Sequence, residues 1–206
     1  MGSTEDAANR PLDIRPATRD DVPAVIDFIY RRPPCSWMRN LSTPSLAAFL
    51  RYAVSESRAV LPLARVPGEK APAGYALAIP DPGAFWLGFA LESPLIAQTI
   101  WFYRRRREAE RRLERGRLRR PEFSWAPPAR ARARILGLYV RLEHRERGVA
   151  RALYADLFER LKARGVSLVE EHVSPDYPLA AGRFPGGFGW RLEACGCGGR
   201  KASKSL

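Results

Sequence analysis

The residues best suited to chemistry in this sequence form one basic cluster, Arg145-Glu146-Arg147-Gly148-Val149-Ala150-Arg151. An apolar run over residues 135–140 precedes the cluster, and residues 152–164 follow it with leucine and phenylalanine at helical spacing. The order is therefore strand, glycine-containing turn and helix. The first N–H groups of such a helix point into the turn at the positive end of the helix dipole, and here arginines surround them. This arrangement predicts a site for a phosphate or pyrophosphate group.

The same turn lacks two common nucleotide-binding fingerprints. Gly148 allows a tight turn and a close approach of the backbone to a ligand. The cluster contains neither Gly-x-Gly-x-x-Gly nor Gly-Lys-Ser/Thr, which excludes a dinucleotide fingerprint and a Walker loop. Turns with glycine and arginine also occur without any ligand, especially in an arginine-rich chain. The turn alone therefore leaves both a phosphate site and a purely structural turn open.

Length, charge and cysteine content bound the class of protein. A chain of 206 residues that is 46% hydrophobic suffices for one domain with its own core. The formal net charge of +13 is compatible with an acidic partner but does not require one. Cys35, Cys195 and Cys197 form neither a disulfide framework nor a zinc motif, so we expect no metal and a reducing, cytoplasmic location. The polar start of the chain is not a signal peptide.

The basic cluster also resembles a known coenzyme-binding motif. Arg145-x-x-Gly148-x-Ala150 is similar to the Arg/Gln-x-x-Gly-x-Gly/Ala signature of the GCN5-related N-acetyltransferases (GNAT superfamily). The resemblance implies acetyl-CoA as co-substrate, with its pyrophosphate on the turn and its pantetheine arm along the backbone of the preceding strand. The implied coenzyme-binding residues are Leu138, Tyr139, Val140, Arg145, Glu146, Arg147, Gly148, Val149, Ala150 and Arg151.

Two further segments resemble the same family. Residues 12–17 alternate like a strand, and Thr18 with Asp21 forms a capping box before a helix, as at the start of family members. Near the C-terminus, Tyr177 stands where the family commonly has asparagine. Phe184 stands where it commonly has a tyrosine that protonates the leaving thiolate, and a phenyl ring donates no proton. This departure affects the expected acid and leaves the coenzyme motif intact.

Acetyl transfer to an amine requires a polarised thioester, a neutral amine and a proton for the thiolate. Backbone N–H groups of the strand before the turn suit the first task. Candidate bases lie on the strand that follows the helix of residues 152–164. Alternation along this strand places Glu171 on one face and Glu170 and His172 on the other. Glu92 is a further candidate. A charged residue on a strand also often simply faces solvent. The residues selected as catalytic candidates are Glu171 as base and Tyr177 or Tyr139 as acid.

The remaining pattern predicts an α/β fold. We expect a helix after Thr43-Pro44, a hairpin from residues 59–66 and 73–79, and a short strand or buried loop at 85–89. A strand over 166–173 completes a β-α-β unit with the strand before the turn. In the family these two strands splay apart. The resemblance implies a mixed, mainly antiparallel sheet of six or seven strands with helices on both faces. We expect a single domain over residues 12–196, with disordered residues 1–11 and a flexible tail over 197–206.

An insert over about residues 92–130 departs from a minimal family member. It predicts a helix from 94 to about 117, and the stretch 104–134 holds 13 arginines against 4 glutamates. Three interpretations compete: a helix packed on the sheet, a lid or dimer contact, and a basic arm for RNA or anionic lipid. The preceding apolar run is broken by Glu92, Gln98 and Ser93-Pro94, so we expect no membrane span.

The hypothesis is an N-acetyltransferase that acts on a primary amine of a small molecule or peptide, with a homodimer as a possible assembly. One alternative is a coenzyme A-binding sensor or interaction module without turnover. Another is an RNA-directed enzyme that acetylates aminoacyl-tRNA, whose binding should weaken steeply with salt. Nothing in the sequence identifies the acceptor.

Overall fold

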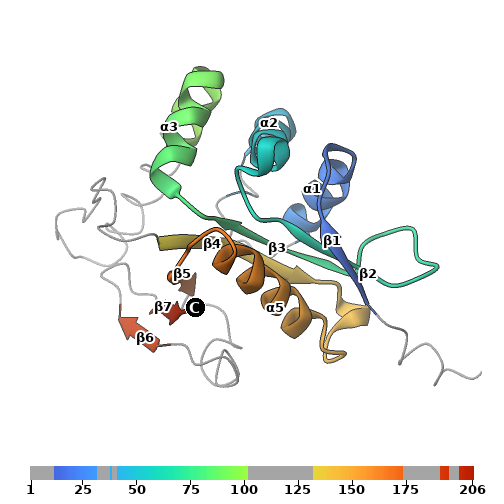
Figure 1. The fold of residues 1–206 in the computed structure, drawn as a ribbon. Coiled ribbons are helices and arrows are strands. Elements are labelled where there is room, and N and C mark those ends of the chain that lie inside the picture. The colour runs from blue at the N-terminus through green and yellow to red at the C-terminus, as the bar shows by residue number, and fades with distance from the viewer. Residues whose placement is uncertain (1–11, 32–37, 39–40, 102–131, 174–190, 195–199) are drawn as a thin grey trace, which may run out of the picture.

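The computed structural model describes residues 12–31, 38, 41–101, 132–173, 191–194 and 200–206. Its strands form one seven-stranded sheet with the order β1-β2-β3-β4-β5-β7-β6 (Figure 1). Neighbouring strands are antiparallel except for the parallel pair β4–β5, which confirms the mixed, mainly antiparallel sheet. The strands are β1 (Asp13–Pro16), β2 (Pro62–Arg65), β3 (Gly74–Ile79), β4 (Arg132–Val140), β5 (Leu168–Val173), β6 (Arg191–Ala194) and β7 (Arg200–Ser205).

Helices cover both faces of this sheet, as expected. One face carries α1 (Val22–Tyr30), α2 (Thr43–Val54) and α3 (Pro82–Glu92), and the other carries α5 (Val149–Lys162) (Figure 1). Side chains of β3 alternate between the two faces, so two cores form. Large side chains face α1–α3, and small ones face α5: the first set is Tyr75, Leu77 and Ile79, and the second is Ala76 and Ala78.

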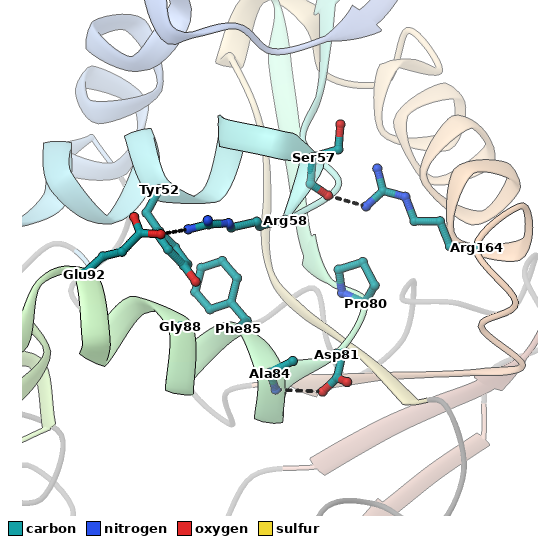
Figure 2. A pocket seen from close by; sticks show the side chains of 10 residues that line it. All are labelled: Tyr52, Ser57, Arg58, Pro80, Asp81, Ala84, Phe85, Gly88, Glu92 and Arg164. Carbon is teal, nitrogen blue, oxygen red and sulfur yellow. Dashed lines mark hydrogen bonds and ion pairs between the residues drawn. The ribbon is translucent and has the colours of Figure 1, made fainter.

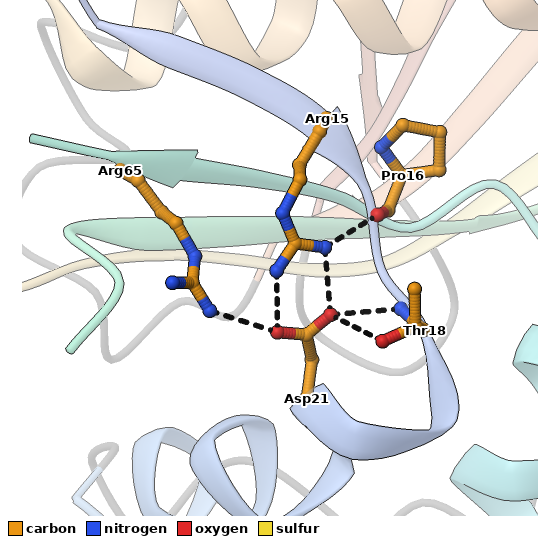
Figure 3. Close-up of polar contacts among 5 residues, drawn as sticks. All are labelled: Arg15, Pro16, Thr18, Asp21 and Arg65. Atoms are coloured by element: carbon orange, nitrogen blue, oxygen red, sulfur yellow. Dashed lines mark hydrogen bonds and ion pairs between the residues drawn. The ribbon is translucent and has the colours of Figure 1, made fainter. Parts of the chain in front are cut away.

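The start of α1 is fixed by a buried carboxylate. The Asp21 side chain, which is 4% exposed, accepts hydrogen bonds from both Nη atoms of Arg15 at 2.8 Å, and Arg65 Nη2 lies 3.0 Å away (Figure 3). It also accepts from the backbone N–H and the hydroxyl of Thr18, which completes the predicted capping box. We call these four residues the Asp21 network. Burial raises the pKa of Asp21, but the hydrogen bonds from Arg15 and Thr18 outweigh it and hold this pKa far below its ordinary value.

The strand or buried loop expected at 85–89 is wrong, because these residues lie in α3. Asp81 caps the helix by accepting a hydrogen bond from the N–H of Ala84 at 3.0 Å, and Pro82 follows at its first turn. Phe85 and Phe89, four residues apart, then face the same side and pack on the ring of Phe49 at centroid distances of 5.6 and 5.7 Å.

Part of the tail that was expected to be flexible over 197–206 is a strand, and residues 197–199 lie outside the described residues. Residues 200–205 form β7, which pairs with β5 from Leu168↔Ser205 to Val173↔Arg200 and with β6 on its other side. The strand is held by backbone hydrogen bonds to its neighbours. Its side chains are mostly polar, so the sequence lacks the apolar alternation by which a strand is usually predicted.

The insert is described only in part. Residues 94–101 are helical, whereas residues 102–131, which include most of the basic stretch, lie outside the described residues. The long basic helix and the RNA-binding alternative therefore stay predictions. Across the part of the chain that the structure covers, none of the helices combines the length and the apolar character needed to cross a membrane.

Candidate coenzyme-binding site

The strands β4 and β5 separate halfway along β4. Their parallel pairing runs from Arg132↔Leu168 to Ile135↔Glu171 and ends there, while β4 continues to Val140 beside β3. We call the place beyond this last pair the fork. It is the separation that the family resemblance implied, and it gives an extended ligand arm a backbone to lie along.

A β-bulge in β4 lies directly at the fork. Leu77 pairs with Gly137 and Ala78 pairs with Ile135, so Leu136 is an extra residue on β4. Ile135 belongs to the core under α5, whereas Leu136 packs against the core under α1–α3. A bulge bends its strand and increases the local twist, which explains why β4 leaves β5 at this position.

The turn after β4 ends in a glycine with a left-handed backbone. Gly148 has φ +76° and is the N-cap residue of α5, and a Cβ built there would meet nothing within 4 Å. The backbone angle, rather than lack of space inside the protein, therefore requires glycine. The N–H of Ala152 is bonded to the carbonyl of Gly148, so the N–H groups of residues 149–151 belong to the helix start that has no intrahelical acceptors.

A second network ties this turn to the β2–β3 hairpin. His144, which is 3% exposed, places Nε2 3.0 Å from Oε2 of Glu69, and its Nδ1 lies 3.5 Å from Nη1 of Arg147. Arg141 pairs with Glu69 at 3.5 Å and also with Glu143. We call Glu69, Arg141, His144 and Arg147 the Glu69 network. Sequence reasoning missed Glu69 and His144; the one available signal was a histidine directly before the coenzyme motif.

The predicted coenzyme residues lie along one continuous path. Leu138, Tyr139 and Val140 end β4 beyond the fork, residues 145–148 form the turn, and residues 149–151 begin α5. Two of them also have internal roles. Val149 is buried in the core, so only its backbone can meet a ligand, and Arg145 donates from Nε to the carbonyl of Val140 at 3.3 Å.

The catalytic candidates are not brought together. Glu171 belongs to the last β4–β5 pair and accepts a hydrogen bond from the hydroxyl of Tyr154 on α5 at 2.8 Å. The ring of Tyr139 instead packs on Phe28 of α1, with centroids 5.3 Å apart. The two candidates therefore lie on opposite faces of the sheet, and Tyr177 lies outside the described residues.

The weaker candidate Glu92 is placed away from the turn. It pairs with Arg58 at a cavity of about 370 Å³ that Tyr52, Phe85 and Arg164 also line (Figure 2). The cavity lies at the Ile79 end of β3, whereas the turn of residues 145–148 lies at the Gly74 end; we call it the coenzyme turn after the motif it carries. Glu92 therefore lies apart from the residues of the coenzyme motif.

Comparison with known sequences defines the family. The sequence model of the Acetyltransferase (GNAT) family matches residues 22–185. The chain belongs to this family of acetyltransferases. A search of curated protein sequences found no match.

Solved structures share the fold at low sequence identity. An N-acetyltransferase from Thermoplasma acidophilum, solved in complex with coenzyme A, is 10% identical with a TM-score of 0.55, and the alignment covers 95% of this chain and 99% of that one. An N-acetyltransferase from Staphylococcus aureus is 11% identical with a TM-score of 0.60 (95% and 98% covered). An acetyltransferase from Thermus thermophilus is 19% identical with a TM-score of 0.53 (95% and 97% covered). These similarities support the fold.

Proposed function

We propose that the protein transfers an acetyl group from acetyl-CoA to a primary amine of a small molecule or peptide. The observation that carries this proposal is the continuous path from the fork, along the end of β4, to the Gly148 turn and the start of α5. An extended coenzyme needs such a path, because its pantetheine arm and its pyrophosphate must be held at the same time. Family membership supports the chemistry.

Each part of the path suits a different part of the coenzyme. The amides of pantetheine would pair with the backbone of residues 138–140, as a peptide adds to a strand. The pyrophosphate would meet the N–H groups of residues 149–151 at the positive end of the α5 dipole. Arg145, Arg147 and Arg151 would add positive charge around it.

The transfer step needs a base and benefits from an acid. The amine nitrogen attacks the thioester carbonyl carbon, the C–S bond breaks, and the coenzyme leaves as a thiolate. Backbone N–H groups near the bulge would stabilise the oxyanion. Glu171, at the last β4–β5 pair, is the proposed acceptor of the amine proton, and Tyr139 or Tyr177 is the proposed donor to the thiolate.

The opposite positions of Glu171 and Tyr139 make these roles separable. Glu171→Gln should lower kcat with little change in KM for acetyl-CoA if this carboxylate takes the proton. Tyr139→Phe should lower kcat in the same way only if the phenol serves as acid. A Glu171→Gln enzyme with full activity would remove Glu171 from the mechanism.

Calorimetric titration with acetyl-CoA tests the proposal directly. We expect micromolar binding by the native protein and at least about ten-fold weaker binding by Gly148→Trp. The matched control is Gly165→Trp, because Gly165 follows the other end of α5 with a φ of +74° and equally open surroundings. Absence of binding by the native protein, or equal loss in both variants, would contradict the proposed site.

A coenzyme-binding module without turnover is the second candidate. Tyr154 already engages the carboxylate of Glu171, and Phe184 replaces the expected tyrosine, which favours this alternative. A protein of this kind would bind acetyl-CoA but release no free thiol when primary amines are supplied.

A further inference from the structure

His144 is a buried polar side chain whose two ring nitrogens both face charged partners. Burial of an imidazole is unfavourable unless its polar atoms are hydrogen-bonded. The Nε2 atom lies 3.0 Å from Glu69 Oε2, and the Nδ1 atom has a longer contact of 3.5 Å with Arg147 Nη1. His144 therefore connects a carboxylate of the β2–β3 turn with an arginine of the coenzyme turn.

The chemistry of the three groups selects one tautomer. An ionised Glu69 only accepts hydrogen bonds and Arg147 only donates them. The neutral ring satisfies both when Nε2 carries the hydrogen and Nδ1 accepts. Hydrogen bonds then run in one direction, from Arg147 to His144 and from His144 to Glu69. The other tautomer would set an N–H of the ring against an N–H of Arg147.

The backbone of Glu69 is fixed within the turn between β2 and β3. Its backbone N–H donates to the carbonyl of Val66 at 3.0 Å, which closes the turn between β2 and β3. The hairpin also reaches the end of β4, because the N–H of Arg141 donates to the carbonyl of Ala73 at 2.9 Å. The segment that leads into the coenzyme turn is therefore connected to the β2–β3 hairpin by both a backbone and a side-chain hydrogen bond.

We infer that Glu69, acting through His144, positions the guanidinium of Arg147 for the pyrophosphate of the coenzyme. A guanidinium is a rigid plane, so a contact at one of its nitrogens restricts the directions that its other N–H groups can take. Glu69 and His144 are positioning residues that touch no substrate atom. The inference rests on the proposed function and adds to it a residue about 75 positions upstream of the motif.

The test compares a ligand that carries the pyrophosphate with one that lacks it. Binding of acetyl-CoA and of S-acetylpantetheine is measured by NMR titration for the native protein and for Glu69→Ala. We expect Glu69→Ala to weaken acetyl-CoA binding about ten-fold and to leave S-acetylpantetheine binding unchanged. Glu69→Gln retains an acceptor for His144 and should restore most of the affinity. A general loosening of the protein would weaken both ligands alike.

Two further variants complete the design. Glu143→Ala is the matched control, because Glu143 also pairs with Arg141 but makes no hydrogen bond to His144 among the described contacts. In an Arg147→Gln background, Glu69→Ala should have no further effect on acetyl-CoA affinity, since the route through Arg147 is already lost.

Three results would overturn the inference. They are unchanged acetyl-CoA affinity in Glu69→Ala, equal weakening of both ligands, and additive effects of the Glu69 and Arg147 substitutions. A native protein that binds neither ligand would instead contradict the proposed function, on which the inference depends.

Discussion

The Asp21 and Glu69 networks use the same chemistry for different purposes. Each pairs a carboxylate with at least one arginine and joins segments distant in sequence, β1 to β2 in one case and the β2–β3 turn to the coenzyme turn in the other. The Asp21 side chain is 4% exposed, whereas that of Glu69 is 36% exposed. We expect the buried carboxylate to stabilise the framework and the accessible one to orient a part of the candidate site.

The physical reason lies in the cost of removing one partner. An amide in place of a buried carboxylate loses the charge-assisted hydrogen bonds and leaves its polar partners imperfectly paired, which is destabilising. When an ion pair in contact with solvent is broken, water solvates the separated charges, so such a pair contributes at most about 1 kcal/mol to the free energy of unfolding. We therefore expect substitutions at Asp21 to act on stability and substitutions at Glu69 to act on ligand binding.

Asp21→Asn should have the largest effect on the free energy of unfolding, a loss of about 2–3 kcal/mol. The amide removes the negative charge that faces Arg15 and Arg65. Urea denaturation at neutral pH measures the change as a lower midpoint. Asp20→Asn is the matched control, because Asp20 is the exposed neighbour in the same turn, and it should be nearly neutral.

The pH dependence of stability sharpens the assignment to Asp21. Because its pKa is lowered in the folded protein, its contribution is fully present above the unfolded value of about 3.9 and is lost as the pH falls below it. The unfolding free energy of the native protein should therefore decrease from about pH 5 downward. The Asp21→Asn variant should lose less over the same range. Parallel curves for the two proteins would contradict the assignment.

Gly148→Ala should cost about 1–2 kcal/mol of unfolding free energy, because alanine must adopt the left-handed φ of +76°. Gly165→Ala, at φ +74°, should cost a similar amount. Thermal melts of both variants measure this. A much larger loss at position 148 would indicate that the coenzyme turn, and not only its backbone angle, contributes to framework stability.

Glu69→Gln should have the smallest effect, less than about 1 kcal/mol of unfolding free energy. His144 keeps an acceptor, and the substituted side chain is partly in water. Urea denaturation beside Asp21→Asn provides the direct comparison. A loss as large as that of Asp21→Asn would remove the distinction between the two networks.

Local patterns predicted most of the fold and the strand-turn-helix order around Gly148. The capping box at Thr18, the hairpin before β4 and the Gly148 turn all depend on neighbouring residues, so the sequence reveals them. The spacing of the aromatic residues in α3 fits both a strand and a helix, and the cap formed by Asp81 and Pro82 is the local signal that favours the helix. β7 and the contact of Glu69 with His144 depend on pairing across the fold, and no local pattern encodes them.

The alanines of the sheet under α5 have a geometric consequence. Ala64, Ala76 and Ala78 are fully buried and pack beneath the leucines of that helix. Side chains this small allow a close approach of the helix to the strands. Replacing one of them with valine or leucine would lift the helix and carry its N-terminal amides away from the end of β4. These small side chains therefore keep the start of α5 beside the end of β4.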